Sequence, residues 1–168
     1  MTAAARQAER LPDGFVRLVA VEPLRASPER AVAMLADDPP WVGLRREPSE
    51  VPELRRYALD LRLRVGGDAA SVATFRKAAY VDFGQPRRTA DGGWEVEIGW
   101  RASSAAPLFP VFSGRLTIGT DELRIEGVYA PPGGVVGRIA DRVLLHVAAR
   151  GTAEWLLAEI DREALAAR

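Results

Sequence analysis

The alternation of apolar and polar residues over positions 57–65 places the strongest constraint on the fold. The apolar set is Tyr57, Leu59, Leu61, Leu63 and Val65, and the residues between them are Ala58, Asp60, Arg62 and Arg64. Side chains of a strand point alternately to opposite faces, so a period of two predicts a β-strand. Because one face is apolar and the other mostly charged, this strand belongs to a sheet with one buried and one solvated side.

Further strands follow along the chain, and short turns join them. The expected strands cover residues 72–83, 94–100, 111–118 and 123–129, with turn signals at Gly66-Gly67-Asp68, Asp91-Gly92-Gly93 and Thr120-Asp121-Glu122. Consecutive strands with such connections predict an antiparallel meander of five strands, not a β-α-β pattern.

A strand and a helix are expected before the meander. Residues 15–22 are rich in valine and predict the strand, and Ser27-Pro28-Glu29 supplies a serine N-cap and a proline at the first helical position. The Asp-Asp-Pro-Pro sequence at residues 37–40 ends this helix. Residues 41–54 are expected to form a loop with room for one short strand.

The C-terminal part of the chain predicts one long helix, from about residue 135 to residue 165. Apolar residues recur there near helical spacing, namely Val136, Ile139, Val143, Val147, Trp155 and Ile160. Gly151 costs about 1 kcal/mol relative to alanine, and its small size favours a bend or a close approach to the sheet. The element order predicts an α+β fold, in which this helix packs across a curved antiparallel sheet of six to seven strands.

Length and charge bound the possible functions. The 168 residues suit a single domain over residues 1–168, with residues 1–13 as a flexible tail that lacks the apolar run of an export signal. The 23 basic residues balance the 23 acidic ones, so we expect no general attraction to nucleic acid or to anionic lipid. The longest apolar stretch, residues 143–149, is too short to span a bilayer.

Several kinds of chemistry are excluded because the sequence contains no cysteine. Disulfides, thiolate metal sites and cysteine nucleophiles are ruled out, and a cysteine-free chain fits the reducing cytoplasm. With His146 as the single histidine, a metal site would need carboxylates, and Asp37-Asp38 and Glu95/Glu97 lack partners at a recognisable spacing. No nucleotide motif and no Gly-x-Ser-x-Gly sequence occur, so we expect no metal and no other cofactor.

Three segments and the order of the elements carry a resemblance to a known superfamily. The segments are residues 27–41, which form the first helix and its Asp-Pro exit, residues 107–116, where a proline- and aromatic-rich stretch leads into a strand, and residues 131–142, the glycine- and proline-rich start of the long helix. In these features the chain resembles, over most of its length, the START-like or SRPBCC superfamily, the helix-grip fold of the birch-pollen allergens and polyketide cyclases.

This resemblance implies a cavity between the sheet and the long helix, commonly for an apolar ligand. It transfers no catalytic role to any residue, because the superfamily mixes cyclases, lipid carriers and chaperone-binding proteins. The short second helix usual in the family is not evident in residues 41–54, so that end of the cavity is either open or closed by a loop. Residues 133–137, Gly-Gly-Val-Val-Gly, are interpreted as the turn into the long helix, although an anion could bind their free amides.

Two titratable residues are candidates for chemistry in such a cavity. His146 on the long helix could point inward as an acid or base, or be a half-exposed helix residue. Lys77 is the single lysine, and it shares the apolar phase of its strand if Phe75, Ala79, Val81 and Phe83 face inward. A lysine held against apolar surface has a lowered pKa and could act as base, cation or nucleophile. In a bulge or in the opposite register, its ammonium group would reach water instead.

Aromatic residues in the apolar phases of the strands are expected to line the cavity. The predicted wall comprises Tyr57, Leu59, Leu61, Lys77, Trp94, Trp100, Phe112, Tyr129 and His146. We expect a pocket of at least about 300 Å³, because small residues at Ala79, Gly114 and Gly127 leave gaps that mid-sized side chains do not fill.

Three functions fit these features. The first is a cytoplasmic protein that binds a small, largely apolar ligand between sheet and helix. The second is a polyketide cyclase- or dehydratase-like enzyme, in which one or two polar residues move protons. The third is a protein-interaction module with a collapsed cavity. The sequence indicates neither the ligand nor the oligomeric state.

Overall fold

The computed structural model describes residues 15–36, 45–49, 53–65, 73–103, 111–130 and 139–167. The predicted α+β architecture is confirmed. The strands are β1 (Val16–Pro23), β2 (Arg45–Glu47), β3 (Arg55–Val65), β4 (Ala73–Phe83), β5 (Arg87–Arg88), β6 (Trp94–Ala102), β7 (Val111–Ile118) and β8 (Glu122–Ala130), and the helices are α1 (Pro28–Ala36) and α2 (Ile139–Ala166).

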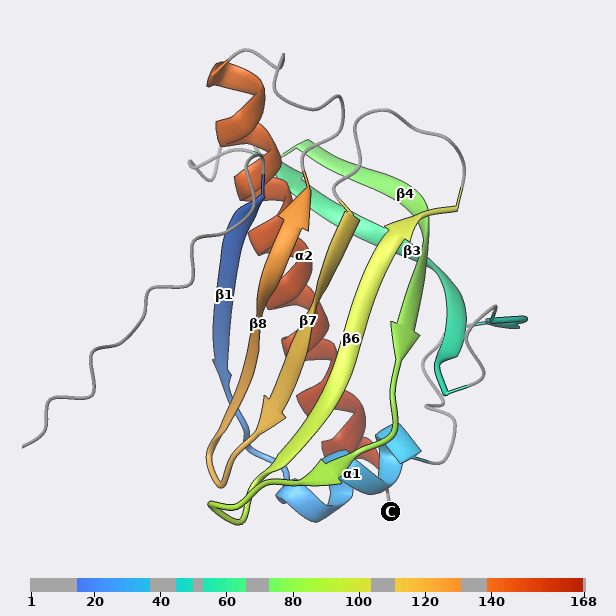
Figure 1. The fold of residues 1–168 in the computed structure, drawn as a ribbon, viewed down its shortest axis with the longest axis vertical. Helices are drawn as coiled ribbons and strands as arrows, with labels where there is room; N and C mark the ends of the chain where they lie inside the picture. The colour runs from blue at the N-terminus through green and yellow to red at the C-terminus, as the bar shows by residue number, and fades with distance from the viewer. Residues whose placement is uncertain are drawn as a thin grey trace, which may run out of the picture.

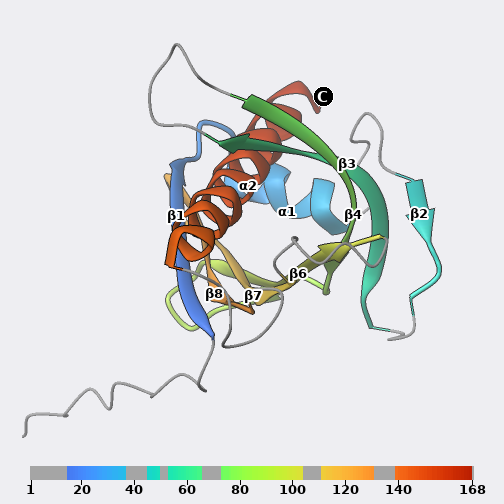
Figure 2. The same cartoon turned by 90° about the horizontal axis from the view of Figure 1, so that it is seen from above.

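The strands form one antiparallel sheet in the order β1-β8-β7-β6-β4-β3-β2, with the two-residue β5 added beside β6. Strands β3, β4, β6, β7 and β8 make up the predicted five-strand meander. Strand β1 instead pairs with the last strand, from Val16 opposite Tyr129 to Pro23 opposite Glu122. The sheet curves around α2, which crosses its concave side (Figures 1 and 2). We call the side toward α2 the inner face and the opposite side the outer face.

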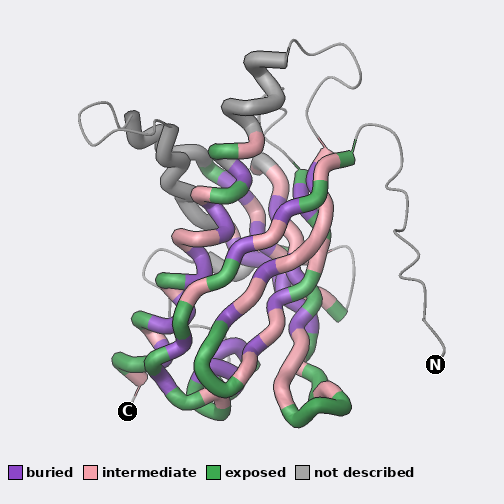
Figure 3. Tube along the Cα trace, turned by 90° about the vertical axis from the view of Figure 1, so that its left-hand side faces the viewer, coloured by how far each residue is buried: buried purple, intermediate pink, exposed green. Residues whose placement is uncertain are grey.

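Buried and exposed positions alternate along the strands, as the period of two predicts (Figure 3). In β6, for example, Val96, Ile98 and Trp100 are buried, whereas Glu97 is exposed. The buried residues face α1 and α2 and form the hydrophobic core. Among the described side chains of β6 and β7, the charged ones therefore lie on the outer face.

Helix α1 begins as predicted, because the Ser27 hydroxyl accepts a hydrogen bond of 3.3 Å from the main-chain N–H of Arg30. At the other end of α1, the buried guanidinium of Arg55 donates to the carbonyl oxygens of Ala36 at 2.8 Å and Gly84 at 3.0 Å. Arg55 thereby ties the last turn of α1 to β3 and to the end of β4.

The buried face of α2 is a stripe with helical spacing. It comprises Ala149, Thr152, Ala153, Leu156, Leu157, Ile160, Asp161 and Ala164. Val147, part of the predicted apolar series, is instead 39% exposed. Residues spaced by four advance about 40° around a helix at each step, so a series with that spacing drifts around the helix, and Val147 lies outside the buried face. The small residues Ala149 and Ala153 are fully buried, and α2 contacts β1, β3, β8 and α1.

A buried carboxylate fixes the C-terminal half of α2 to the start of α1. Asp161 accepts hydrogen bonds from the main-chain N–H groups of Arg25 at 2.7 Å and Ala26 at 3.1 Å, and from Nε of Arg25 at 2.7 Å. Burial raises the pKa of Asp161, but these hydrogen bonds and the charge of Arg25 outweigh it, so the net pKa is lowered.

Some predictions fall on residues outside the described ranges. These are the tail at residues 1–13, the missing second helix within residues 41–44 and 50–52, and the turn at residues 133–137. Residues 45–47 form the short strand for which the loop had room. Within the described ranges, no helix is both long and apolar enough to cross a membrane.

Candidate functional site

A row of aromatic side chains crosses the inner face of the sheet. Strand pairing places Tyr57 opposite Val81, Val81 opposite Trp100, Trp100 opposite Phe112, and Phe112 opposite Tyr129. All of these residues are buried. We call Tyr57, Trp100, Phe112 and Tyr129 the aromatic row. The period of two in each strand, together with the register, brings these predicted wall residues into one line.

The centre of the aromatic row is closely packed. The rings of Trp100 and Phe112 are stacked, with centroids 3.8 Å apart and planes 15° from parallel. A Cβ atom added to Gly114 or to Gly127 would lie 2.7 Å from Cζ of Phe112. The expectation that these two glycines leave a gap is therefore wrong, because the Phe112 ring occupies that space. Ala79, the third expected gap, is fully buried in the core.

Tyr129 at the end of the row meets His146 of α2. The phenolic oxygen of Tyr129 lies 3.2 Å from Nδ1 of His146, at hydrogen-bonding distance. Tyr129 is 1% exposed, and burial raises the pKa of its phenol, so the phenol keeps its proton. It can donate to an unprotonated Nδ1, or accept when Nδ1 carries the hydrogen. The structure thus joins a predicted wall residue of the sheet to the predicted acid–base candidate of the helix.

The indole N–H of Trp100 is a buried donor, and it has no hydrogen-bond partner among the residues that the structure describes. Leaving such a group unpaired costs about 1–3 kcal/mol. Buried unpaired donors are rare in folded proteins, and a bound molecule or water is one common explanation. The aromatic row therefore offers one unsatisfied N–H, from Trp100, and one hydrogen-bonded hydroxyl, from Tyr129.

The remaining predicted wall residues do not join this cluster. Trp94 lies at the opposite end of β6 from Trp100, beneath the guanidinium of Arg88, whose Cζ is 4.5 Å from the indole centroid. The side chains of Leu59, Leu61 and Lys77 are outside those described. The backbone register places Leu59 opposite Ala79 and Leu61 opposite Lys77. The inward direction of Lys77 stays a prediction.

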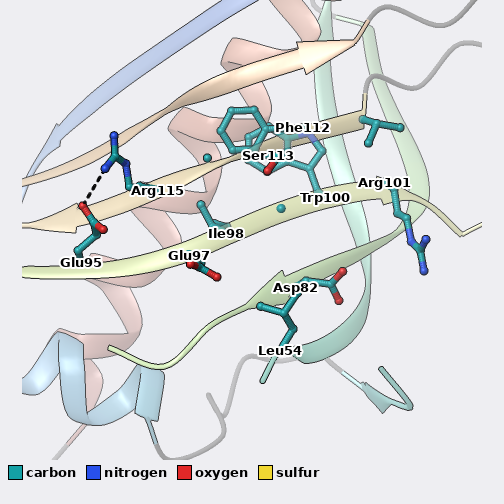
Figure 4. Close-up of a pocket in the computed structure, with 13 residues that line it drawn as sticks. Leu54, Asp82, Glu95, Glu97, Ile98, Trp100, Arg101, Phe112, Ser113 and Arg115 are labelled. Atoms are coloured by element: carbon teal, nitrogen blue, oxygen red, sulfur yellow. Dashed lines mark ion pairs between the residues drawn. The ribbon is translucent and has the colours of Figure 1, made fainter. Parts of the chain in front are cut away.

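A hollow of about 500 Å³ lies over the outer face of the sheet. It is lined by Leu54, Asp82, Glu95, Glu97, Ile98, Gly99, Trp100, Arg101, Val111, Phe112, Ser113, Gly114 and Arg115 (Figure 4). Trp100 and Phe112 border it, but the charged residues of its lining belong to the outward phase of β4, β6 and β7. It is therefore not the predicted cavity, and a cavity between sheet and α2, not seen among the described residues, stays a prediction.

Sequence reasoning missed the residues that shape this outer hollow. In the sequence, Glu95 and Glu97 are a pair of acids without metal-ligand partners at a recognisable spacing, and Asp82, Arg101 and Ser113 belong to no motif. One signal was visible in the sequence, since Gly99 interrupts the outward charged series between Glu97 and Arg101. A glycine at an outward position leaves a dip between its neighbours. In the described part of the chain, no group of three potential metal ligands occurs.

The curved antiparallel sheet wrapped around a long C-terminal helix, with a buried aromatic row on its inner face, is a helix-grip fold. No family model and no curated protein matches the sequence. Among solved structures, the chain is similar to the di-domain ARO/CYC BexL from the BE-7585A biosynthetic pathway, with a TM-score of 0.58 and 12% identity over 94% of this chain and 52% of that chain. The chain thus spans about half the length of BexL.

The chain also matches a conserved protein from Geobacillus kaustophilus. The TM-score is 0.47 and the identity 15%, over 90% of this chain and 96% of that chain. At these identities the likeness to BexL establishes the fold.

Proposed function

We propose that the protein binds a small, largely apolar ligand between α2 and the inner face of the sheet, beside Tyr129 and His146. The observation that carries this proposal is the hydrogen bond of 3.2 Å between these two side chains at the sheet–helix interface. Ligand sites of this kind are mostly apolar walls with a few polar groups that fix orientation. The aromatic row supplies the wall, and the Tyr129 hydroxyl, the His146 ring and the Trp100 N–H supply the polar groups.

The proposed site extends from the aromatic row toward the paired segments 59–65 of β3 and 73–79 of β4. Beyond the pair of Tyr57 and Val81, the register there pairs Leu59 with Ala79 and Leu61 with Lys77. A ligand in this position would have the Tyr129–His146 pair on the β8 side of its site. The reducing compartment expected for a cysteine-free chain makes a cytoplasmic ligand the natural candidate.

A second candidate is an enzyme resembling polyketide cyclases or dehydratases. It is favoured by the protonated phenol of Tyr129, which could exchange a proton with a substrate while His146 accepts or returns one. The similarity of fold to BexL adds support by analogy.

The third candidate, an interaction module with a collapsed cavity, is favoured by the Phe112 ring, which fills the space over Gly114 and Gly127.

Native mass spectrometry of freshly purified protein tests the binding proposal. We expect a retained small molecule in the wild type and in Tyr80→Phe, which changes a tyrosine of the outer face. We expect retention to fall about tenfold in Tyr129→Phe, since one hydrogen bond to the ligand site is lost. Two results together would favour the interaction module. The purified protein would retain no small molecule, and the NMR signals of Trp100 and Tyr129 would not shift when a panel of apolar compounds is added.

The enzyme candidate is separated from simple binding by following the retained molecule over time. An enzyme of the dehydratase type releases it with the loss of one water. A carrier returns it unchanged. If the His146→Gln variant still binds the molecule but no longer converts it, the proton transfer is assigned to His146.

A further inference from the structure

Gly99 is one of the residues that line the hollow on the outer face. Strand pairing places Gly99 between Asp82 of β4 and Ser113 of β7. Because Gly99 has no side chain, it leaves an opening on the outer face of β6 between Glu97 and Arg101, which also line the hollow (Figure 4). A volume of about 500 Å³ is within the range of small-molecule sites.

Most charges around this hollow are already neutralised. Asp82 accepts two hydrogen bonds from the Arg56 guanidinium, at 2.8 Å from Nε and 3.0 Å from NH2. Glu95 is paired with Arg115 at 3.5 Å. These two ion pairs leave one acid and one base of the lining without a partner.

The two unpartnered charges are Glu97 and Arg101. In the described part of the chain, no ion pair or hydrogen bond is made by the carboxylate of Glu97 or by the guanidinium of Arg101. The Arg101 guanidinium lies over the Tyr80 ring, with Cζ 5.9 Å from the ring centroid, a contact that orients it and leaves its N–H donors available. An acid acceptor and a planar base thus stand on either side of an empty glycine position.

The spacing of these two charges selects the size of a ligand. Positions four residues apart on one strand have Cα atoms about 13 Å apart, and both side chains are long enough to lean inward. An extended tripeptide spans about 10 Å from its amino group to its carboxylate. Leu54 and the exposed Val111 border the hollow and add apolar surface to its lining.

We propose that the outer hollow binds a short zwitterionic peptide. Glu97 binds the terminal ammonium group and Arg101 the terminal carboxylate, while the peptide backbone lies over Gly99 and Ser113. The site lies on the face opposite the Tyr129–His146 pair, so this proposal and the proposed ligand cavity stand or fall separately.

An NMR titration with triglycine tests the proposal. We expect the amide signals of Gly99 and Ser113 to shift in a saturable way. Glu97→Gln should weaken triglycine binding about tenfold, and Arg101→Gln by a similar factor, since each removes one charge-assisted contact at a solvent-exposed site. Arg88→Gln, which removes an arginine stacked on a ring outside the hollow, and Glu122→Gln should bind like the wild type.

Capped peptides assign each charge to its residue. Acetyl-triglycine lacks the ammonium group, so Glu97→Gln should no longer affect its binding, whereas Arg101→Gln still should. Triglycine amide should show the reverse pattern. Thermal melts establish that each variant is folded. Absent shifts at Gly99 and Ser113, or an affinity that capping and the two substitutions leave unchanged, would overturn the proposal.

Discussion

The phenolic oxygen of Tyr129 and Nδ1 of His146 are 3.2 Å apart, and this contact joins the last strand of the sheet to α2. Tyr129 stands opposite Phe112 on one side and opposite Val16 on the other. The hydrogen bond therefore links the helix to the aromatic row and to the pairing of β1 with β8. Its loss has consequences that can be measured without a ligand.

Tyr129→Phe should lower the free energy of unfolding by about 1 kcal/mol at pH 7. Burial raises the pKa of Tyr129 above its ordinary value of 10.0, so the stabilisation by the neutral phenol is fully present below pH 10.0 and is lost as pH rises through the higher folded-state pKa. The advantage of the wild type over the variant should then shrink in alkaline urea titrations. Tyr80→Phe is the control, and an advantage that stays constant with pH would contradict the buried, protonated phenol.

Gly114→Ala should destabilise the domain by about 2–3 kcal/mol, since overpacking a core costs about that much. The added Cβ would lie 2.7 Å from both Phe112 Cζ and the Cα of Gly127, and backbone atoms cannot yield as a flexible side chain can. Gly119→Ala is the matched control, because its Cβ meets its nearest atom at 3.4 Å. Chemical denaturation of both variants gives the comparison. Equal midpoints would mean that the Phe112 ring does not cover the glycine pair.

Asp161→Asn should weaken folding by about 1.5–3 kcal/mol near pH 6, as the hydrogen bonds lose their charged acceptor. The pKa of Asp161 is lowered from 3.8, so its stabilisation is complete above pH 3.8 and disappears as pH falls through the lower folded-state value. The difference between wild type and variant should therefore vanish in acid. Denaturation curves at several pH values measure it, with the exposed Asp121→Asn as control. A difference independent of pH would show that the carboxylate charge contributes nothing.

Arg55→Met should cost about 2–4 kcal/mol, because the carbonyl oxygens of Ala36 and Gly84 would lose their donor in a buried place. Arg55→Lys should recover little of this, since one ammonium group cannot reproduce the planar fork of a guanidinium. Arg30→Met on the exposed side of α1 is the control. If the Arg55→Lys variant is as stable as the wild type, the two carbonyl oxygens do not need the two-pronged donor geometry of a guanidinium.

The sheet was predictable because its signals are local. The alternation over residues 57–65 and 94–100, and the turn residues between strands, depend on neighbours in the sequence, and the structure has β3, β6 and the hairpin of β7 and β8 where the pattern predicts them. The N-cap at Ser27 was predictable for the same reason. The two-residue β5 was not, since so short a strand has no periodicity.

The contents of the sheet–helix interface were less predictable because they depend on side-chain direction. The phase of Phe112 was clear from the sequence, but its ring could have pointed toward a cavity or folded over Gly114 and Gly127, and only packing decides between these. The same holds for Asp161, which lies in a helical series of ordinary acidic residues. Its partners are 136 and 135 positions away, at Arg25 and Ala26, so no local pattern reveals them.

The pairing of β1 with β8 also determines at what point during synthesis the sheet can finish folding. Strands β3 to β8 lie beside strands that are near in sequence, so they can assemble as soon as they have been synthesised. Val16 can pair in the sheet only after Tyr129 has been synthesised, and Arg25 can form its hydrogen bonds only after Asp161 has been synthesised. During synthesis on the ribosome, the first strand therefore has no partner strand until the last strand emerges, and its valine-rich sequence is exposed to other chains during that time. The Tyr129–His146 contact, made by the final helix, is among the last to form.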